Sequence, residues 1–339
     1  MSQEKIQRRS VLGATAALGA TAGLAAVPGV PAAASAPSVA SGTGKVVLIT
    51  GTSSGFGNLT ALTLARAGYR VYASMRGTAS ANAAPARALR DVARRERLAL
   101  EVVDIDVRDD RSVEEGVRRV RQRAGRIDVL VNNAGMFHPA VLETQTIADV
   151  RNIFDTNLYG HLRMNRAVLP TMRAQRDGLV IQVTTALGRF VFPFLGAYCG
   201  AKWALEAMTE ITRYEVSQLG VDVIIVEPGA YSTDFVDPNG VGYYRQYLRH
   251  LSPDNTRRRA EYGELAQRAE SHLIEDSTAD PQEIADTIAT VVRTPRGQRP
   301  ARVLGPGVHD FIGELHEAAT RVQAGIMAAS GFGDLTTAP

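Results

Sequence analysis

Cysteine is nearly absent from this chain of 339 residues, and the single cysteine is Cys199. One cysteine excludes an intramolecular disulfide and any metal site built from several thiolates. The six histidines are scattered, and none stands with acidic residues at ligand spacing, so we expect no metal site. The fold must therefore be held by packing, for which 45% hydrophobic residues are ample.

The sequence also lacks a strong charge of one sign. Its net charge is +3, and residues 1–36 supply three basic residues against one acid, which leaves the remainder close to neutral. The arginines at 257–259 are not interleaved with aromatic residues and are typical of a solvated helix face. We therefore expect no nucleic-acid partner.

Long apolar runs are missing except near the start. Residues 11–27 are apolar with small interruptions, and they follow the pair Arg8-Arg9. Together with the small residues Ala34-Ser35-Ala36, this is the layout of a twin-arginine export signal with a signal-peptidase site. We predict a signal over 1–36 that is cleaved after Ala36.

The export signal has consequences for location. A linker over 37–44 would follow it, and the mature protein would be periplasmic or extracellular; without a functional signal it would be cytoplasmic. The alternative is an uncleaved amphipathic or anchoring helix, because an apolar run of this length is near the lower limit for spanning a bilayer. Its Gly and Ala content makes a weak anchor, so we expect no stable membrane span in the mature form.

From Gly44 onward, β-rich apolar runs alternate with helical patterns, which predicts parallel βαβ units. The expected strands are 45–50, 69–74, 98–106, 127–133, 179–184, 221–228 and, as a seventh candidate, 299–306. The expected helices are 58–67, 86–96, 112–124, 147–174, 198–219 and 281–293.

This alternation predicts a single Rossmann-type α/β domain, a doubly wound parallel sheet with helices on both faces. We place the domain at 45–325 and a C-terminal tail at 326–339. Residues 236–280 break the rhythm with mixed charge and aromatics, and we interpret them as a substrate-loop insertion over the sheet edge.

The first expected strand runs directly into a glycine-rich turn, Gly51-Thr52-Ser53-Ser54-Gly55-Phe56-Gly57, and then into a helix. Glycines permit close approach of a pyrophosphate to the backbone, and the start of the helix favours its negative charge. Strand, turn and helix in this order predict a dinucleotide site, whereas a glycine cluster alone would fit a tight turn without a ligand.

The spacing of this turn is the first of several motifs that resemble the classical short-chain dehydrogenase/reductase family. The others are Asn132-Asn133-Ala134-Gly135, Asn157, the pair Tyr198 and Lys202, and Pro228-Gly229 followed by Thr233. The resemblance covers residues 45–235 and implies an oxidoreductase with a nicotinamide cofactor. Its segments look most like the branch that contains hydroxysteroid and retinol dehydrogenases.

Tyr198 and Lys202 are four residues apart on an expected helix, so both project from one face. A ketone that accepts a hydride needs a proton, and a nearby cation lowers the pKa of a tyrosine toward operating pH. The resemblance implies that Lys202 also holds the nicotinamide ribose and that Asn157 anchors a water in a proton relay. Thr185 stands where the family has a serine that orients the substrate oxygen, with Thr184 as the fallback.

The end of the second strand decides between the two nicotinamide cofactors. It carries Arg76 and no acid, which favours NADP(H) over NAD(H) because Arg76 can pair with a 2′-phosphate. Asp106 and Val107 match the family's adenine contacts, although Asp106 would also serve as a strand-ending acid. The resemblance assigns Asn133, Ala134, Gly135, Pro228, Gly229 and Thr233 to the cofactor as well.

Large apolar residues near the reacting atoms suggest a lipophilic alcohol or ketone as substrate. We predict Phe137, Leu187, Phe192 and Tyr231 as substrate contacts; core or subunit packing is the other interpretation of these aromatics. The expected activity is interconversion of a secondary alcohol and a ketone or aldehyde. A dehydrogenase for polar, sugar-type alcohols and a non-catalytic nicotinamide-binding protein remain the alternatives. The resemblance implies a homodimer or homotetramer.

Overall fold

The computed structural model describes residues 44–273, 279–305, 308 and 310–336. The expected signal, its cleavage site after Ala36 and the linker up to residue 43 lie outside the described residues. Within them, seven parallel strands form one sheet in the order β3-β2-β1-β4-β5-β6-β7. The strands are β1 (Val46–Thr50), β2 (Arg70–Met75), β3 (Leu100–Asp104), β4 (Val129–Asn132), β5 (Gly178–Val183), β6 (Val221–Glu227) and β7 (Arg302–Leu304).

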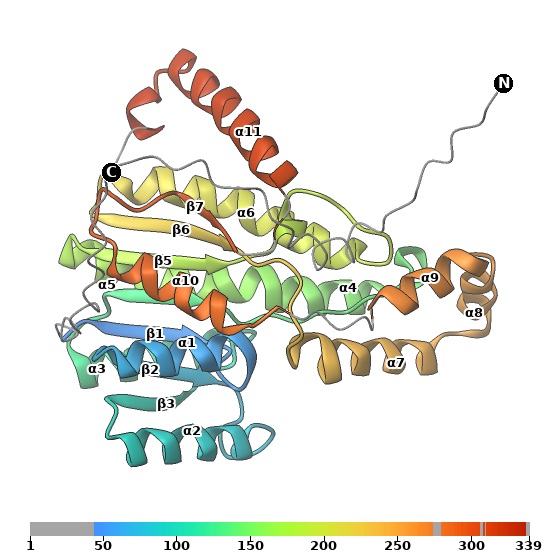
Figure 1. Ribbon diagram of the computed structural model, residues 1–339, viewed down its shortest axis with the longest axis horizontal. Coiled ribbons are helices and arrows are strands. Elements are labelled where there is room, and N and C mark those ends of the chain that lie inside the picture. Colours follow the sequence, from blue (N-terminus) through green and yellow to red (C-terminus); the bar gives the residue numbers. More distant parts are fainter. Residues whose placement is uncertain (1–43, 274–278, 306–307, 309, 337–339) are drawn as a thin grey trace, which may run out of the picture.

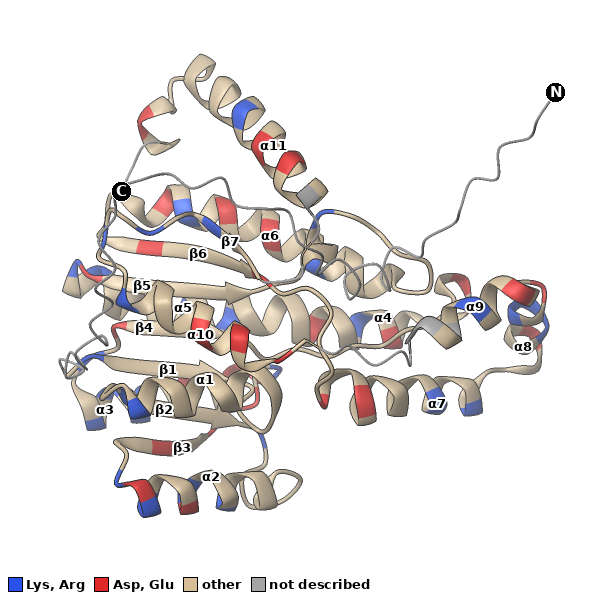
Figure 2. Ribbon diagram, in the orientation of Figure 1, with Lys and Arg blue, Asp and Glu red and all other residues tan. Residues whose placement is uncertain are grey.

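Helices cover both faces of this sheet (Figure 1). Those that flank it are α1 (Gly55–Arg66), α2 (Ala83–Glu96), α3 (Asp110–Ala124), α4 (Ile147–Phe154), α5 (Gly160–Gln175), α6 (Gly196–Ser217) and α10 (Gln282–Arg293). Alternate residues of one strand pack into opposite layers. The side chains of Val47 and Ile49 pack against α1, α2 and α10, whereas those of Val46 and Leu48 pack against α3 and α5. The expected doubly wound sheet is confirmed, and its central strands carry few charges (Figure 2).

The expected single helix over 147–174 is divided in the structure. α4 ends at Phe154, a π-helical turn, η3 (Asp155–Tyr159), follows, and α5 begins at Gly160. Backbone angles stay helical at the flanking Phe154 and Gly160, so a periodicity pattern does not detect the break. The widened turn is significant because it carries Asn157, and π-turns inside helices are frequent at functional sites.

The segment that interrupts the strand-helix alternation forms three helices, α7 (Val241–His250), α8 (Pro253–Ala260) and α9 (Gly263–Leu273). They lie beyond the carboxyl ends of the strands, where Figure 1 shows them extending away from the sheet. The last long helix, α11 (Asp310–Ala329), continues past residue 325, where we expected the domain to end. His316 in its first half bonds Glu227 at the end of β6 at 2.8 Å, and the helix extends away from the sheet in Figure 1.

Candidate active site

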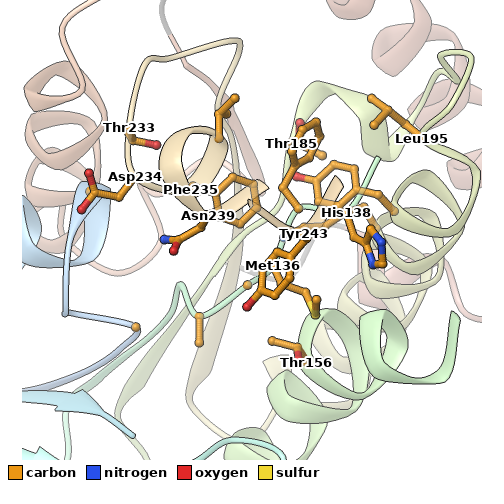
Figure 3. A pocket seen from close by; sticks show the side chains of 18 of the residues that line it. Met136, His138, Thr156, Thr185, Leu195, Thr233, Asp234, Phe235, Asn239 and Tyr243 are labelled. Atoms are coloured by element: carbon orange, nitrogen blue, oxygen red, sulfur yellow. The ribbon is translucent and has the colours of Figure 1, made fainter. Parts of the chain in front are cut away.

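A cavity of about 2160 Å³ opens at the carboxyl ends of β1, β4, β5 and β6. Ligand pockets for one small molecule usually measure roughly 300–1,000 Å³, so this cavity has room for a dinucleotide and a second molecule together. The strand order reverses between β1 and β4, and such a switch point is where doubly wound sheets bind ligands. Figure 3 shows side chains that line it.

The glycine turn forms one end of the cavity. Gly51 and Gly55 have φ values of 70° and 53°, a region that residues with a Cβ rarely adopt. A Cβ on Gly57 would lie 2.3 Å from the Gly51 carbonyl oxygen, so glycine is required for α1 to close against the end of β1. The turn therefore depends on all three glycines, but for different reasons.

Most of the predicted turn residues line the cavity: Gly51, Ser53, Ser54, Gly55 and Phe56. Thr52 and Gly57 are not among the lining residues. Thr52 is fully buried, and its hydroxyl donates to the Ser74 carbonyl oxygen at 3.1 Å. Thr52 thus joins the turn to β2.

Asn133, Ala134 and Gly135 follow β4 and also line the cavity. The Asn133 amide donates to the carbonyl oxygens of Thr50 and Gly51, each at 3.0 Å. The Thr50 hydroxyl accepts from the backbone of Asn133 and Ala134, also at 3.0 Å. These bonds couple the ends of β1 and β4, so the glycine turn has a fixed position beside the centre of the site.

The end of the cavity near β2 and β3 is charged. Arg76, Asp106 and Val107 all line it, as does Arg108. The Asp106 carboxylate accepts from the Arg108 guanidinium at 3.2 Å. Burial alone would raise the pKa of Asp106, but the bonds from Arg108 and the charge of Arg76 hold that pKa below its ordinary value. Arg76 follows β2 directly, where the sequence places it.

Tyr198 and Lys202 lie on the first two turns of α6, and both line the cavity. They are 5% and 3% exposed. Burial raises the pKa of Tyr198, and the Thr185 hydroxyl opposes this rise. This direction is opposite to the lowering we expected from Lys202, because removal from water dominates. Burial lowers the pKa of Lys202 to about 8, and its ammonium donates to the Val183 carbonyl oxygen at 3.0 Å.

The two candidate threonines that follow β5, Thr184 and Thr185, differ in the hydrogen bonds of their hydroxyl groups. The Thr184 hydroxyl donates to Glu206 on α6 at 2.9 Å. The Thr185 hydroxyl accepts from the Leu187 backbone at 3.3 Å, and it also bonds the Tyr198 hydroxyl, whose pKa it lowers against the rise caused by burial. This arrangement favours Thr185 as the hydroxyl that meets a substrate oxygen, in agreement with the spacing argument.

Glu206 belongs to none of the motifs recognised in the sequence. Its carboxylate is 1% exposed. It accepts from the Thr184 hydroxyl at 2.9 Å and from the Arg189 guanidinium at 2.8 Å. Arg302 of β7 binds both Glu206 and Glu210 at 2.7 Å. Glu206 is four residues after Lys202, and this spacing could have indicated that its side chain lies on the same face of α6. Glu206 holds both ends of the loop that carries Thr185.

Asn157 is buried and does not line the cavity. Its side chain donates to the Met136 carbonyl oxygen at 2.8 Å and accepts from the Met136 backbone at 2.7 Å. His161, one turn later, contacts the Ala134 carbonyl oxygen at 2.8 Å and Gln182 at 2.7 Å. Burial lowers the pKa of His161 to about 4. Both side chains brace the segment after β4, and the water relay through Asn157 stays a prediction.

The predicted substrate residues divide into two groups. Phe137 packs edge-on against Tyr198 at 5.3 Å between ring centroids, and Leu187 and Phe192 line the same cavity. Tyr231 packs against Phe56 of the glycine turn at 5.4 Å, and its hydroxyl bonds Glu283. Tyr231 also lines the cavity, at the end that the glycine turn forms, and its contact with a substrate stays a prediction.

The segment after β6, residues 228–235, covers the site. Pro228, Gly229 and Thr233 line the cavity, and their contacts with a cofactor stay a prediction. A Cβ on Gly55 would lie 3.6 Å from Thr233, and one on Gly135 would lie 3.3 Å from Phe235. This segment thus reaches across from the glycine turn to the segment after β4.

The described residues contain no group of three or more His, Cys, Asp or Glu side chains placed to hold a metal ion. Among their helices, none is long and apolar enough to cross a membrane.

The chain is similar to known proteins over most of its length. The profile of the family described as short chain dehydrogenase matches residues 45–241. Retinol dehydrogenase 8 of Bos taurus is 30% identical over 272 residues, which cover 74% of this chain and 79% of the relative.

Solved structures agree with the sequence comparison. A short-chain dehydrogenase from Streptomyces avermitilis has a TM-score of 0.65 and 30% identity, and the match covers 85% of this chain and 97% of that one. An alcohol dehydrogenase from Thermococcus sibiricus, complexed with 5-hydroxy-NADP, has a TM-score of 0.60 and 25% identity, with 77% and 96% covered. The chain belongs to the short-chain dehydrogenase/reductase family of oxidoreductases.

Proposed function

We propose that this protein interconverts a lipophilic secondary alcohol and the corresponding ketone with NADP(H), and that Tyr198 is the general acid/base. One observation carries the proposal: Tyr198, Lys202 and Thr185 line the same cavity as the glycine turn. A cofactor on the turn and a substrate at Tyr198 would therefore share one cavity, which is the condition for direct hydride transfer.

The residues present fit a nicotinamide dinucleotide, which supplies or accepts the hydride when bound. Gly51 and Gly55 bring backbone close to the cavity, and α1 begins beside them. Arg76 and Arg108 provide positive charge at the adenine end, where β2 ends without an acid. This end supports NADP(H) in preference to NAD(H).

The proton is handled by this chain's own side chains. Because burial raises the pKa of Tyr198, its hydroxyl is protonated at neutral pH and can donate to an oxygen on which negative charge develops. Thr185 offers a second donor to the same oxygen. The Lys202 ammonium favours the tyrosinate that remains after proton transfer.

The substrate end supports a lipophilic molecule. Phe137, Leu187, Phe192 and Leu195 line the cavity around Tyr198, and a relative of this chain is a retinol dehydrogenase. A polar, sugar-type alcohol is the second candidate, because hydrogen-bonding side chains such as Thr144, Gln246 and His250 line the same cavity. A panel of bulky ketones and of small polyols separates the two candidates.

The decisive experiment has two arms. Purified protein is titrated with NADPH and NADH by fluorescence, and oxidation of NADPH is then followed with the ketone panel. Binding of NADPH with turnover of bulky ketones supports the proposal. Binding without turnover of any substrate favours a non-catalytic nicotinamide-binding protein, and absence of binding overturns both.

Export and assembly belong to the same proposal. Twin-arginine export transports folded proteins, so we propose that the protein leaves the cytoplasm with its cofactor bound and releases it slowly.

We also propose a homodimer or homotetramer formed through the long helices. Trp203, Met208 and Ile211 on α6 support this because they are 46%, 39% and 53% exposed. Light scattering after gel filtration gives the subunit number, and the eluted peak shows whether nicotinamide is retained.

A further inference from the structure

His138 is a buried polar residue in the lining of the cavity. The residue follows Phe137, lines the cavity and is 7% exposed. Its Nε2 atom is buried and has no hydrogen-bond partner among the described residues. A buried donor or acceptor without a partner is costly, so such an atom in a cavity wall calls for an explanation.

The neighbours of His138 do not supply the missing bond. Its ring lies 6.0 Å from that of Tyr243 and 6.2 Å from that of Tyr247, measured between centroids. The Tyr247 hydroxyl is already bonded to Thr144. Burial lowers the pKa of His138, so its imidazole is neutral at physiological pH and offers one donor and one acceptor.

His138 lies on the substrate side of the reacting groups. Phe137, the preceding residue, contacts the Tyr198 ring edge-on. In Figure 3, His138 and Leu195 appear on one side of Thr185, whereas Thr233 and Asp234 of the cofactor-side segment appear on the other. A molecule that reaches from Tyr198 away from the cofactor would pass this imidazole.

We propose that His138 binds a second oxygen of the substrate, an uncharged hydroxyl or carbonyl remote from the carbon that is oxidised or reduced. This inference rests on the proposed function and refines its substrate class from lipophilic ketones to lipophilic ketones with a second oxygen. Aromatic and apolar neighbours suit a neutral oxygen, since a carboxylate beside a neutral imidazole would be buried without a counter-charge. The alternative is that the ring only fills space.

The test compares matched substrates in matched variants. Each pair consists of a bulky ketone and the same skeleton with a distant hydroxyl, such as 4-cyclohexylcyclohexanone and its 4′-hydroxy derivative, together with hydroxylated and plain decalones. The quantity measured is the ratio of kcat/KM for the hydroxylated ketone to that for the plain ketone. We expect the native protein to favour the hydroxylated member of at least one pair. In His138→Phe this ratio should fall about tenfold, the typical value of one hydrogen bond in a buried site.

His138→Gln is the matched control, because its amide keeps a donor and an acceptor and should restore most of the ratio. Melting temperature and NADPH affinity of each variant report on folding. Loss of activity that is equal for both ketones of a pair would identify a space-filling role and overturn the proposal. A native protein that reduces plain ketones without preferring any hydroxylated one would overturn it while the proposed function stands. Absence of all ketone turnover would refute the proposed function itself.

Discussion

Glu206 accepts a hydrogen bond from the Thr184 hydroxyl at 2.9 Å, and this bond joins α6, which carries Tyr198, to the strand end that carries Thr185. The Arg189 guanidinium reaches the other oxygen of the same carboxylate at 2.8 Å. A Cβ on Gly188 would lie 2.2 Å from Glu206, so the loop between the two anchors packs directly on it. One buried carboxylate therefore sets the position of the Thr185 hydroxyl relative to Tyr198.

This geometry predicts opposite outcomes for the two threonines. Thr185→Val removes a donor to the substrate oxygen and is expected to lower kcat by about 10²–10³-fold, with little change in melting temperature. Thr185→Ser should retain most of the activity, because it keeps the hydroxyl. Thr184→Val leaves a buried carboxylate oxygen short of a partner, so it should chiefly lower stability, by about 1–3 kcal/mol. Steady-state kinetics and thermal unfolding of the three variants test this; a larger kcat loss in Thr184→Val would reverse the assignment.

Replacement of Tyr198 by Phe should lower turnover by about 10²–10⁴-fold, since it removes the proton donor. NADPH affinity should change little, because the glycine turn and the adenine end are separate from this hydroxyl. Stopped-flow turnover and fluorescence titration measure the two quantities. Activity close to that of the native protein would refute the assigned mechanism.

The pH dependence should reflect Lys202. Its pKa is about 8, so its positive charge is present below this pH and is lost as the pH rises through it. We therefore expect kcat/KM to fall as the pH rises above about 8. The charge of Glu206 raises the pKa of Lys202, so Glu206→Gln should move this limb to lower pH.

Glu210→Gln is the matched control for that experiment. Glu210 binds the same two arginines as Glu206 but is not among the groups that shift the pKa of Lys202. The alkaline limb should therefore stay in place in Glu210→Gln. If both variants move the limb equally, the effect comes from general loosening of the ion-pair network.

Arg76 should determine the choice of cofactor. Arg76→Gln is expected to weaken NADPH binding by about tenfold or more, because a charge-assisted bond to the 2′-phosphate is lost, and to leave NADH binding nearly unchanged. Arg87→Gln on the exposed face of α2 is the control. Parallel titrations give the affinity ratio, and equal weakening of both cofactors would place Arg76 outside the discriminating contact.

The export prediction concerns residues outside the described structure. Replacement of Arg8 and Arg9 by Lys should retain the full-length protein in the cytoplasm, because the twin-arginine pair is the address that the pathway reads. Cell fractionation and N-terminal sequencing test it. A mature chain that begins at Pro37 agrees with the predicted cleavage, whereas an intact Met1 in exported protein contradicts it.

The sequence by itself determined the sheet and the order of its motifs. Strands buried on both faces and a glycine turn between strand and helix are local patterns, and local patterns are visible in one dimension. For the same reason, the pairing of Tyr198 and Lys202 could be predicted from their spacing on a helix.

Only the tertiary structure decided which side chains share the cavity and how burial shifts their pKa values. It brings Glu206 to Thr184 and Arg302, leaves Thr52 out of the cavity lining, packs Tyr231 against the glycine turn and places His138 in the cavity lining. It also reverses the expected pKa shift of Tyr198. Burial and long-range contacts depend on how distant segments pack, and desolvation acts on a group only after that packing has removed its water.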